Sequence, residues 1–341
     1  MNETLLIAHA SSPRLTLIDA ATLQPMGEIL TPGRTAVLGT SSDGRYGFAI
    51  HRDDDCITLI DGANGASRTI QTEAEPTHFH AYAGQVVVFN DGAGSVSIFD
   101  EAALDQPPRV VKATQPDHGS AVVIDGYLLA GHLRLGQVDV YRIADGQWVQ
   151  SFDCCPVLHG AAQIGQTAAF GCNDGVLLIR KIGDTFDGIK LDNPPDAPRR
   201  ARVGIFALHP SQPLLLGNSG AGLALIDVAQ AIIRILPLPA HPLKFTFDRS
   251  GAAILTLTHE GTLYGLDPTS GKIVASVSVT QPVEIPKGPT GGPHPTFAIG
   301  DDAIYVAAPD EQRLTVIDAS FSIGQTLSLN DQPNAVVCLR A

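Results

Sequence analysis

The sequence predicts an all-β fold, an eight-bladed β-propeller, and three observations support this. A hydrophobic segment that ends in Asp or a close variant recurs about every forty residues. Hydrophobic residues make up 44% of the chain and charged residues 17%, with Gly 34 and Pro 24, a balance typical of short buried strands joined by tight turns. The end of the chain lacks strands that its beginning supplies. We therefore expect residues 1–341 to form a single propeller domain.

The recurring segment is the third strand of each predicted blade. Each copy follows a turn rich in Gly, Asn or Asp and precedes another short strand, which fits a four-stranded blade. Seven blades would require one copy to be spurious. The eight copies are "LTLID" (15–19), "ITLID" (57–61), "VSIFD" (96–100), "VDVYR" (138–142), "VLLIR" (176–180), "LALID" (223–227), "TLYGLD" (262–267) and "LTVID" (314–318).

Each predicted blade contains four strands, A to D, as in "THFHAYAGQ", "VVVFND", "SVSIFD" and "RVVKA" of residues 76–115. The last A strand, "NAVVCLRA", has no B, C or D strand after it. The N-terminal segments "LLIAHA", "RLTLID" and "MGEIL" supply these three strands. The first and last segments are therefore expected to share one blade, which closes the sheet arrangement and removes exposed edges.

The charge balance and hydropathy pattern exclude two classes of partner. Lys+Arg 22 against Asp+Glu 35 gives 22 − 35 = −13, which repels nucleic acid and anionic lipid. The chain has no run of eighteen apolar residues, so we expect no membrane insertion. The N-terminal "MNETLLIAHASS" lacks the features of a signal peptide, which is expected to be absent or already removed.

Histidines recur at one position of the predicted A strands, six or seven residues before the turn that ends each strand. In a propeller the A strands line the central channel, so equivalent positions lie at one depth near its mouth. Neither β-propensity nor turn chemistry favours His there. The histidines at this position, all expected metal-site residues, are His78, His118, His159, His241 and His294.

Three of these histidines belong to consecutive predicted blades, so the imidazoles of His78, His118 and His159 could converge on one ion. Three neutral imidazoles are a familiar ligand set for Zn²⁺, with a fourth position left to water, a carboxylate or another His. His80 points to the same side of its strand as His78, and Asp117 precedes His118, so either could complete the coordination. The alternative is that inward histidines only bond water or backbone.

Two cysteines and an absence of catalytic motifs complete the sequence-based expectations. Cys155 precedes an A strand and Cys172 ends the paired B strand, so the two could be close enough to bridge, which would imply an oxidising compartment. The sequence also lacks the common catalytic motifs. It contains no GxSxG, HExxH, P-loop or GxGxxG motif, so we do not expect an enzyme. Two alternatives stay open: a propeller enzyme with a His-ligated metal or d1-type haem, and an interaction scaffold without metal.

Three segments resemble the bacterial periplasmic zinc metallochaperones of the AztD type, which accompany a zinc ABC importer. They are "FDCCPVLHGAAQIGQTAAFGCNDGVLLI" (152–179), "PTHF" (76–79) and "PDHGSAV" (116–122). The resemblance implies a propeller in the periplasm that binds Zn²⁺ and delivers it to the importer's solute-binding protein. It implies metal-site roles for His78, His118 and His159 and a disulfide between Cys155 and Cys172. A removed signal peptide fits this location. The chain departs from the pattern at Cys154, a second cysteine before Pro156.

Overall fold

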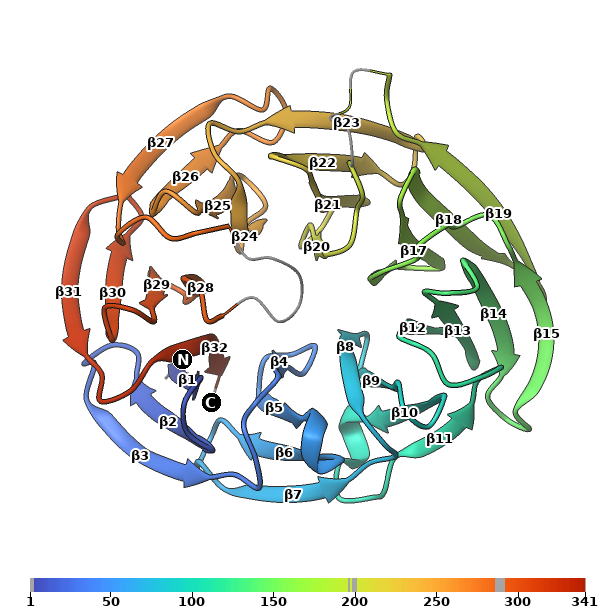
Figure 1. Cartoon of the computed structure of the whole chain (residues 1–341), viewed down its shortest axis with the longest axis horizontal. Coiled ribbons are helices and arrows are strands. Elements are labelled where there is room, and N and C mark those ends of the chain that lie inside the picture. Colours follow the sequence, from blue (N-terminus) through green and yellow to red (C-terminus); the bar gives the residue numbers. More distant parts are fainter. Residues whose placement is uncertain (1–2, 196, 198–200, 286–291, 341) are drawn as a thin grey trace. The chain divides into compact units, whose positions relative to one another are not determined.

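The computed structural model describes residues 3–195, 197, 201–285 and 292–340 (Figure 1). These residues form strands β1 to β32 and two 3-10 helices, η1 (Arg52–Asp54) and η2 (Glu101–Ala103). Neither helix is long and apolar enough to span a membrane. The strands assemble into eight four-stranded sheets, each in the simple meander order of a propeller blade. The predicted fold class, an all-β eight-bladed β-propeller, is confirmed.

The first of two compact units comprises residues 1–71 and 240–341 and contains four sheets. Its strands, sheet by sheet, are β1 (Glu3–His9), β2 (Arg14–Asp19), β3 (Pro25–Leu30) and β32 (Pro333–Arg340); β4 (Val37–Thr40), β5 (Tyr46–His51), β6 (Cys56–Asp61) and β7 (Ser67–Gln71); β24 (Pro242–Phe247), β25 (Ile254–Thr258), β26 (Thr262–Leu266) and β27 (Ile273–Ser278); β28 (Thr296–Ile299), β29 (Ala303–Ala308), β30 (Arg313–Asp318) and β31 (Ile323–Ser328).

The second compact unit comprises residues 72–239 and also contains four sheets. Its strands, sheet by sheet, are β8 (Pro76–Tyr82), β9 (Gln85–Asn90), β10 (Ser95–Asp100) and β11 (Arg109–Lys112); β12 (Gly119–Ile124), β13 (Tyr127–His132), β14 (Gln137–Arg142) and β15 (Gln147–Phe152); β16 (Ala161–Ile164), β17 (Thr167–Cys172), β18 (Gly175–Ile182) and β19 (Thr185–Asp192); β20 (Phe206–Leu208), β21 (Leu214–Ser219), β22 (Gly222–Asp227) and β23 (Ile232–Pro237).

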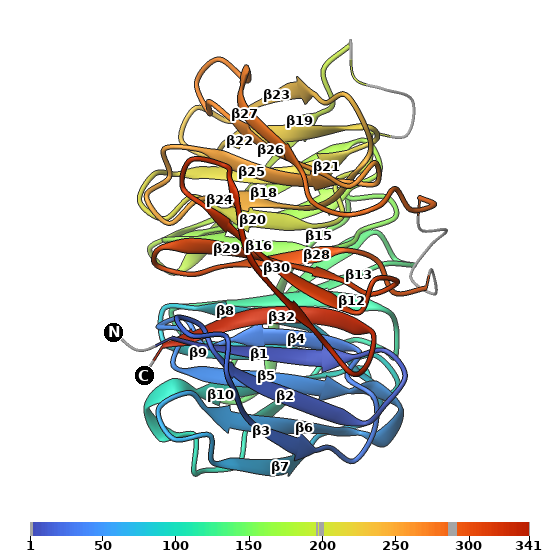
Figure 2. The same cartoon turned by 90° about the vertical axis from the view of Figure 1, so that its left-hand side faces the viewer.

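One blade joins the two ends of the chain, as the sequence predicts. Strand β32 pairs antiparallel with β1, from Glu3 opposite Arg340 to His9 opposite Pro333, and Figure 2 shows the two strands side by side. The sheet order β3-β2-β1-β32 makes the C-terminal strand the A strand of a blade whose other strands are N-terminal. This pairing covers the edge that β1 would otherwise expose.

The hydrophobic core lies between neighbouring sheets of each unit. In the second unit, Val122 and Leu129 of one sheet pack with Phe170 and Leu177 of the next, and all four are buried. The B and C strands are accordingly buried along most of their length, whereas the D strands β3, β27 and β31 are largely exposed. Each sheet therefore buries both faces of its central strands and turns its last strand to solvent.

Polar pairs link the B and C strands inside four blades. The last residue of each B strand contacts a C-strand residue seven positions later, so the turn between them fixes one register. Each pair brings two polar side chains of the core into contact, and three of the four place a buried histidine at the end of a B strand. The pairs are His9 with Thr16 (2.8 Å), His51 with Thr58 (2.8 Å), Asn90 with Ser97 (3.0 Å) and His132 with Asp139 (3.4 Å).

The aligned histidines stand at the beginnings of the A strands, mostly just outside them. His78 lies within β8, but β12 begins at Gly119, after His118, and β16 at Ala161, after His159. The sequence pattern suggested strands that begin with His. The difference has a local cause at His118, because its backbone amide donates to the Asp117 side chain (2.8 Å) and so does not join the ladder.

Candidate metal centre

The imidazoles of His78, His118 and His159 meet in one cluster within the second unit. Each offers one ring nitrogen to a group whose ligand atoms all lie within 4.8 Å of one another. The Nε2 atoms of His78 and His118 are 2.9 Å apart, and the three ring centroids are separated by 4.6, 4.8 and 5.2 Å. Two nitrogens bound to one tetrahedral Zn²⁺ stand roughly 3.3 Å apart, given Zn–N bonds of about 2.0 Å. The spacings of 2.9 Å and at most 4.8 Å lie on either side of this value, so the three histidines could hold a metal ion.

A buried carboxylate orients His118. Asp91, which directly follows β9 and is 6% exposed at its side chain, places Oδ2 2.7 Å from Nδ1 of His118. The backbone amide of Asp91 in turn donates to the carbonyl of Glu75 (2.9 Å), one residue before β8. The turn that ends β9 is thus tied to the start of the strand that carries His78, so the carboxylate and both histidines belong to one local framework.

A backbone carbonyl orients His159 in the same way. The Gly204 oxygen lies 2.7 Å from Nδ1 of His159. Asn218 on β21 holds this segment, because its Oδ1 accepts from the amides of Gly204 (2.8 Å) and Ile205 (2.9 Å). The position of His159 is therefore set from outside its own blade by the Gly204 carbonyl, whose segment is held in turn by a side chain of β21.

These partners determine which ring nitrogen can bind a metal. A carbonyl oxygen only accepts hydrogen bonds, so Nδ1 of His159 carries the proton and Nε2 keeps a lone pair. The Asp91 carboxylate imposes the same tautomer on neutral His118. A ring that donates through one nitrogen to a carboxylate or carbonyl and presents the other is the usual arrangement of a metal-binding histidine. His118 and His159 therefore each present an Nε2 lone pair, the protonation state that a metal requires.

Burial also favours the neutral form of His159. Its pKa is lowered mainly by desolvation; the Gly204 carbonyl opposes this shift, and the positive charge of Arg202 adds to it. A lowered pKa means that the unprotonated ring persists at a more acidic pH than for a solvated histidine. His159 is therefore available as a ligand throughout the neutral range.

Two glycines permit the close approach of these segments. Gly119, after His118, has its α-carbon so near the Gly131 carbonyl that a Cβ would stand 2.5 Å from that oxygen. Gly160, after His159, has φ +73°, and a Cβ there would stand 2.4 Å from the Gly204 carbonyl. The repeated His-Gly pair in the sequence thus has a steric reason, since a side chain at either position would push the histidine's neighbours apart.

A disulfide anchors the loop that carries His159. Cys155 and Cys172 are bonded, both fully buried, with α-carbons 4.9 Å apart. Within the same loop the His159 amide donates to the carbonyl of Gly171 (2.9 Å), the residue before Cys172. The structure thus contains the disulfide that the sequence suggested. Of the remaining cysteines, Cys154 is exposed and unbonded.

Two residues expected to complete the coordination have other surroundings. Both carboxylate oxygens of Asp117 accept backbone amides, from His118 and Arg134, each at 2.8 Å, and the residue is 4% exposed. His80 lies two residues along β8 from His78 and stacks on Tyr82 with ring centroids 6.4 Å apart. Burial lowers the pKa of His80 to about 4. Neither residue belongs to the three-histidine group.

The other two aligned histidines belong to the first unit. His241 directly precedes β24, and its carbonyl accepts from the His259 amide (2.9 Å). His294 lies two residues before β28, with Nδ1 3.4 Å from the carbonyl of Gly292. Both are partly buried. Neither is in the group formed by His78, His118 and His159.

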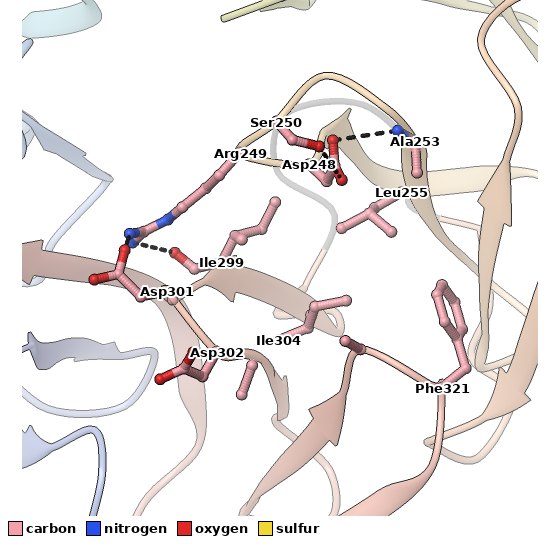
Figure 3. A pocket seen from close by; sticks show the side chains of 13 residues that line it. Asp248, Arg249, Ser250, Ala253, Leu255, Ile299, Asp301, Asp302, Ile304 and Phe321 are labelled. Carbon is pink, nitrogen blue, oxygen red and sulfur yellow. Dashed lines mark hydrogen bonds and ion pairs between the residues drawn. The ribbon is translucent and has the colours of Figure 1, made fainter.

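A separate cavity of about 380 Å³ lies in the first unit between the A–B turns of two neighbouring sheets (Figure 3). Leu255, Ile304 and Phe321 supply apolar walls, and Arg249 crosses one side, where it contacts Asp301 and the Ile299 carbonyl. None of the described residues that line this cavity is a histidine or a cysteine. Its residues do not form a site for a metal that prefers imidazole or thiolate ligands.

Comparison with known proteins supports the expected relationship. No family model matches the chain. A curated protein of Citrobacter koseri named zinc chaperone AztD is 27% identical over 98% of this chain and 86% of its own length. The chain is similar to a zinc chaperone. Two solved structures of Citrobacter koseri AztD, one of them the apo form, have TM-scores of 0.89 and 0.90 at 25% identity, with 99% of this chain and 98% of each AztD chain covered.

The resemblance to AztD inferred from the sequence is thereby confirmed. AztD is named as a chaperone and not as an enzyme, in line with the expectation of a non-enzymatic protein. The dihydro-heme d1 dehydrogenase NirN, solved in complex with DHE, has a TM-score of 0.70 at 14% identity over 98% of this chain and 74% of its own, which shows a shared fold alone.

Proposed function

We propose that this protein is a zinc metallochaperone that binds Zn²⁺ through the Nε2 atoms of His78, His118 and His159. One observation carries the proposal: the three rings converge, while Asp91 and Gly204 hold the opposite nitrogens of two of them. The similarity to AztD supports zinc as the cargo. Three imidazoles leave one coordination position open, which suits an ion that must be received and released.

Zinc binding requires His78 to change its tautomer. Nε2 of His118 has a lone pair because its Nδ1 faces Asp91, so the 2.9 Å contact makes Nε2 of His78 the donor in the neutral, metal-free cluster. Zn²⁺ replaces this proton as the link between the two rings, and His78 then carries its proton on Nδ1. His118 and His159 need no such change. The cluster is thus largely preorganised for the ion.

We further propose delivery of the ion to the solute-binding protein of a zinc ABC importer, in the periplasm. The disulfide between Cys155 and Cys172 supports an oxidising compartment. The net charge of −13 favours encounter with cations and disfavours nucleic acid as a partner. Transfer suits ligands that come from separate blades, because the acceptor can replace them one at a time.

Zinc titration with a matched pair of variants tests the proposal. His118→Ala,His159→Ala should lose about one tightly held Zn²⁺ per chain while circular dichroism shows an unchanged fold. The control is His241→Ala,His294→Ala, which we expect to keep that zinc. Wild-type affinity should fall between about pH 7.5 and about pH 5, because imidazole binds zinc only when unprotonated. Equal zinc binding by wild type and the first variant would contradict the proposal, and a haem-type absorption spectrum would favour the enzyme alternative.

A further inference from the structure

Arg202 lies two residues from the Gly204 carbonyl that holds His159, and two of its three guanidinium nitrogens have no hydrogen-bond partner among the described residues. It precedes β20 and lies between two buried residues, Ala201 (2% exposed) and Val203 (0%). Gly204, two residues later, holds His159 through its carbonyl. Among the residues that the structure describes, Nε and Nη2 of Arg202 are buried and have no hydrogen-bond partner. The positive charge of Arg202 interacts with His159 and contributes to the lowered pKa of that histidine.

Burying guanidinium nitrogens without acceptors is unfavourable in free energy, and a bound anion would offset this cost. Arginine stays protonated in proteins, so its donors remain charged even when water is removed. Buried donors without acceptors lose hydration and gain nothing in exchange. By contrast, Arg313 has one buried unpaired nitrogen, Nε, but its Nη2 pairs with Glu311 at 2.7 Å. Arg202 has no such carboxylate among the described residues.

The net positive charge of a zinc-loaded cluster also favours an anionic ligand. Three neutral imidazoles do not reduce the charge of Zn²⁺, and Arg202 adds a further positive charge nearby. Asp91 contributes one negative charge through its contact with His118, which is less than the combined positive charge of Zn²⁺ and Arg202. A bound ion would therefore leave an excess of positive charge at its open coordination position. An anionic fourth ligand would reduce this excess.

The two unpaired nitrogens identify the class of anion. Nε and Nη2 form the side edge of a guanidinium, which presents two parallel N–H groups. This edge matches the two oxygens of a carboxylate in a bidentate contact. A carboxylate has enough lone pairs to bind Zn²⁺ as well, and it is an ordinary zinc ligand.

We infer that Arg202 binds a carboxylate and presents it to the open coordination position of zinc at His78, His118 and His159. The inference rests on the zinc-binding function proposed above. The carboxylate belongs either to an Asp or Glu side chain of the zinc acceptor or to a small free acid. In the first case Arg202 would recruit the acceptor's first ligand while the histidines still hold the ion.

The test measures zinc affinity with and without a carboxylate probe. Zinc is titrated against a competing chromophoric chelator in a non-coordinating buffer with sodium perchlorate. Separate arms replace the perchlorate, at equal ionic strength, with acetate, phosphate or chloride. Two further arms use a blocked Gly-Glu-Gly peptide and its Gly-Gln-Gly counterpart. The variants are Arg202→Gln and Arg202→Lys, and the matched control is Arg180→Gln, an exposed arginine on β18.

We expect acetate or the Glu peptide to tighten zinc binding by wild type and Arg180→Gln roughly tenfold, as for one charge-assisted contact. Arg202→Gln should lose this gain but still bind zinc without the probe, and Arg202→Lys should keep part of it.

A gain with the Glu peptide but not acetate would assign the carboxylate to a protein side chain, and equal gains would assign it to small acids. The same acetate response in wild type and Arg202→Gln, or equal gains from phosphate and chloride, would overturn the inference alone. Failure of wild type to bind zinc in any arm would overturn the proposed function and the inference together.

Discussion

Asp91 sets the tautomer of His118 through a contact of 2.7 Å and so leaves Nε2 free for the proposed zinc ion. Removing the carboxylate in Asp91→Ala frees the ring to rotate and to change its tautomer. Such outer contacts typically affect metal affinity by about 10- to 100-fold. We therefore expect zinc affinity to fall by about this factor, measured by chelator competition.

The control for Asp91→Ala is Asp187→Ala, an exposed carboxylate on β19 of the same unit. It changes the net charge equally and should leave zinc affinity nearly unchanged. A similar loss in both variants would mean that long-range charge, and not the contact with His118, explains the effect.

A second carboxylate governs acid stability. Burial of Asp331 opposes its ionisation, but the Ser11 and Ser12 hydroxyls and the Gln332 amide donate to it and lower its pKa from 3.8 to about 2. A pKa lowered by folding contributes stability above the unfolded pKa, and this contribution is lost as pH falls from about 4 to about 2. Asp331→Asn should therefore be less stable at neutral pH and lose less stability over that acid range.

Urea unfolding at about pH 7, 4 and 2.5 checks this expectation for Asp331. Asp53→Asn, at an exposed position in η1, serves as the control and should behave as wild type. If Asp331→Asn and wild type lost the same free energy of unfolding between pH 4 and pH 2.5, the account of Asp331 would be wrong.

At the scale of elements, the loop between β15 and β16 links the disulfide to His159, one of the proposed metal ligands. It runs from Cys155 through a residue with positive φ, Val157 (+52°), to His159, and the Gly171 carbonyl receives the His159 amide. Such a loop has little regular structure of its own, so its covalent anchor limits the conformations open to His159. Its geometry therefore depends on Cys172 at the end of β17.

Replacing both bonded cysteines in Cys155→Ser,Cys172→Ser should affect stability and zinc affinity together. The residues are separated by 17 positions, and a loop of this size predicts a loss of about 3 kcal/mol in the free energy of unfolding. Zinc affinity should fall several-fold because His159 must be ordered on binding. Cys154→Ser, at the adjacent exposed cysteine, is the control for both measurements. Unchanged zinc affinity despite the loss of stability would limit the disulfide to a role in folding.

At the scale of the whole molecule, closure of one blade by both ends of the chain makes β32 essential. Leu339 on this strand is fully buried, and β32 covers the edge of β1 along its whole length. A chain that ends at residue 332 would expose β1 and open the core beneath it. We expect it to aggregate or to melt at least about 10 °C lower, whereas removal of residue 341 alone should change little. Cooperative melting at the wild-type temperature would contradict this role for β32.

Much of this organisation could be predicted from the sequence, because the strand pattern of one blade recurs eight times along the chain. The recurring strand gave the blades, and the missing strands after "NAVVCLRA" indicated the shared blade. The positions of His78, His118 and His159 followed from alignment of the A strands. Their register is a property of the repeat and therefore visible in sequence.

The partners of these histidines could not be predicted in this way. Asp91 lies in the turn segment "NDGAG", where Asp is ordinary turn chemistry, and Gly204 acts through a carbonyl that every residue has. Arg202 lies in an irregular segment ahead of strand β20, which begins only at Phe206. Contacts between blades depend on tertiary packing, which the repeat period does not encode.

Anomalous diffraction at the zinc edge, from crystals of the wild-type protein loaded with one equivalent of Zn²⁺, tests the central claim most directly. We predict one strong peak bound by Nε2 of His78, His118 and His159, with Asp91 and Gly204 still bonded to the opposite nitrogens of His118 and His159. A zinc ion held elsewhere, with these three imidazoles unliganded, would contradict the account.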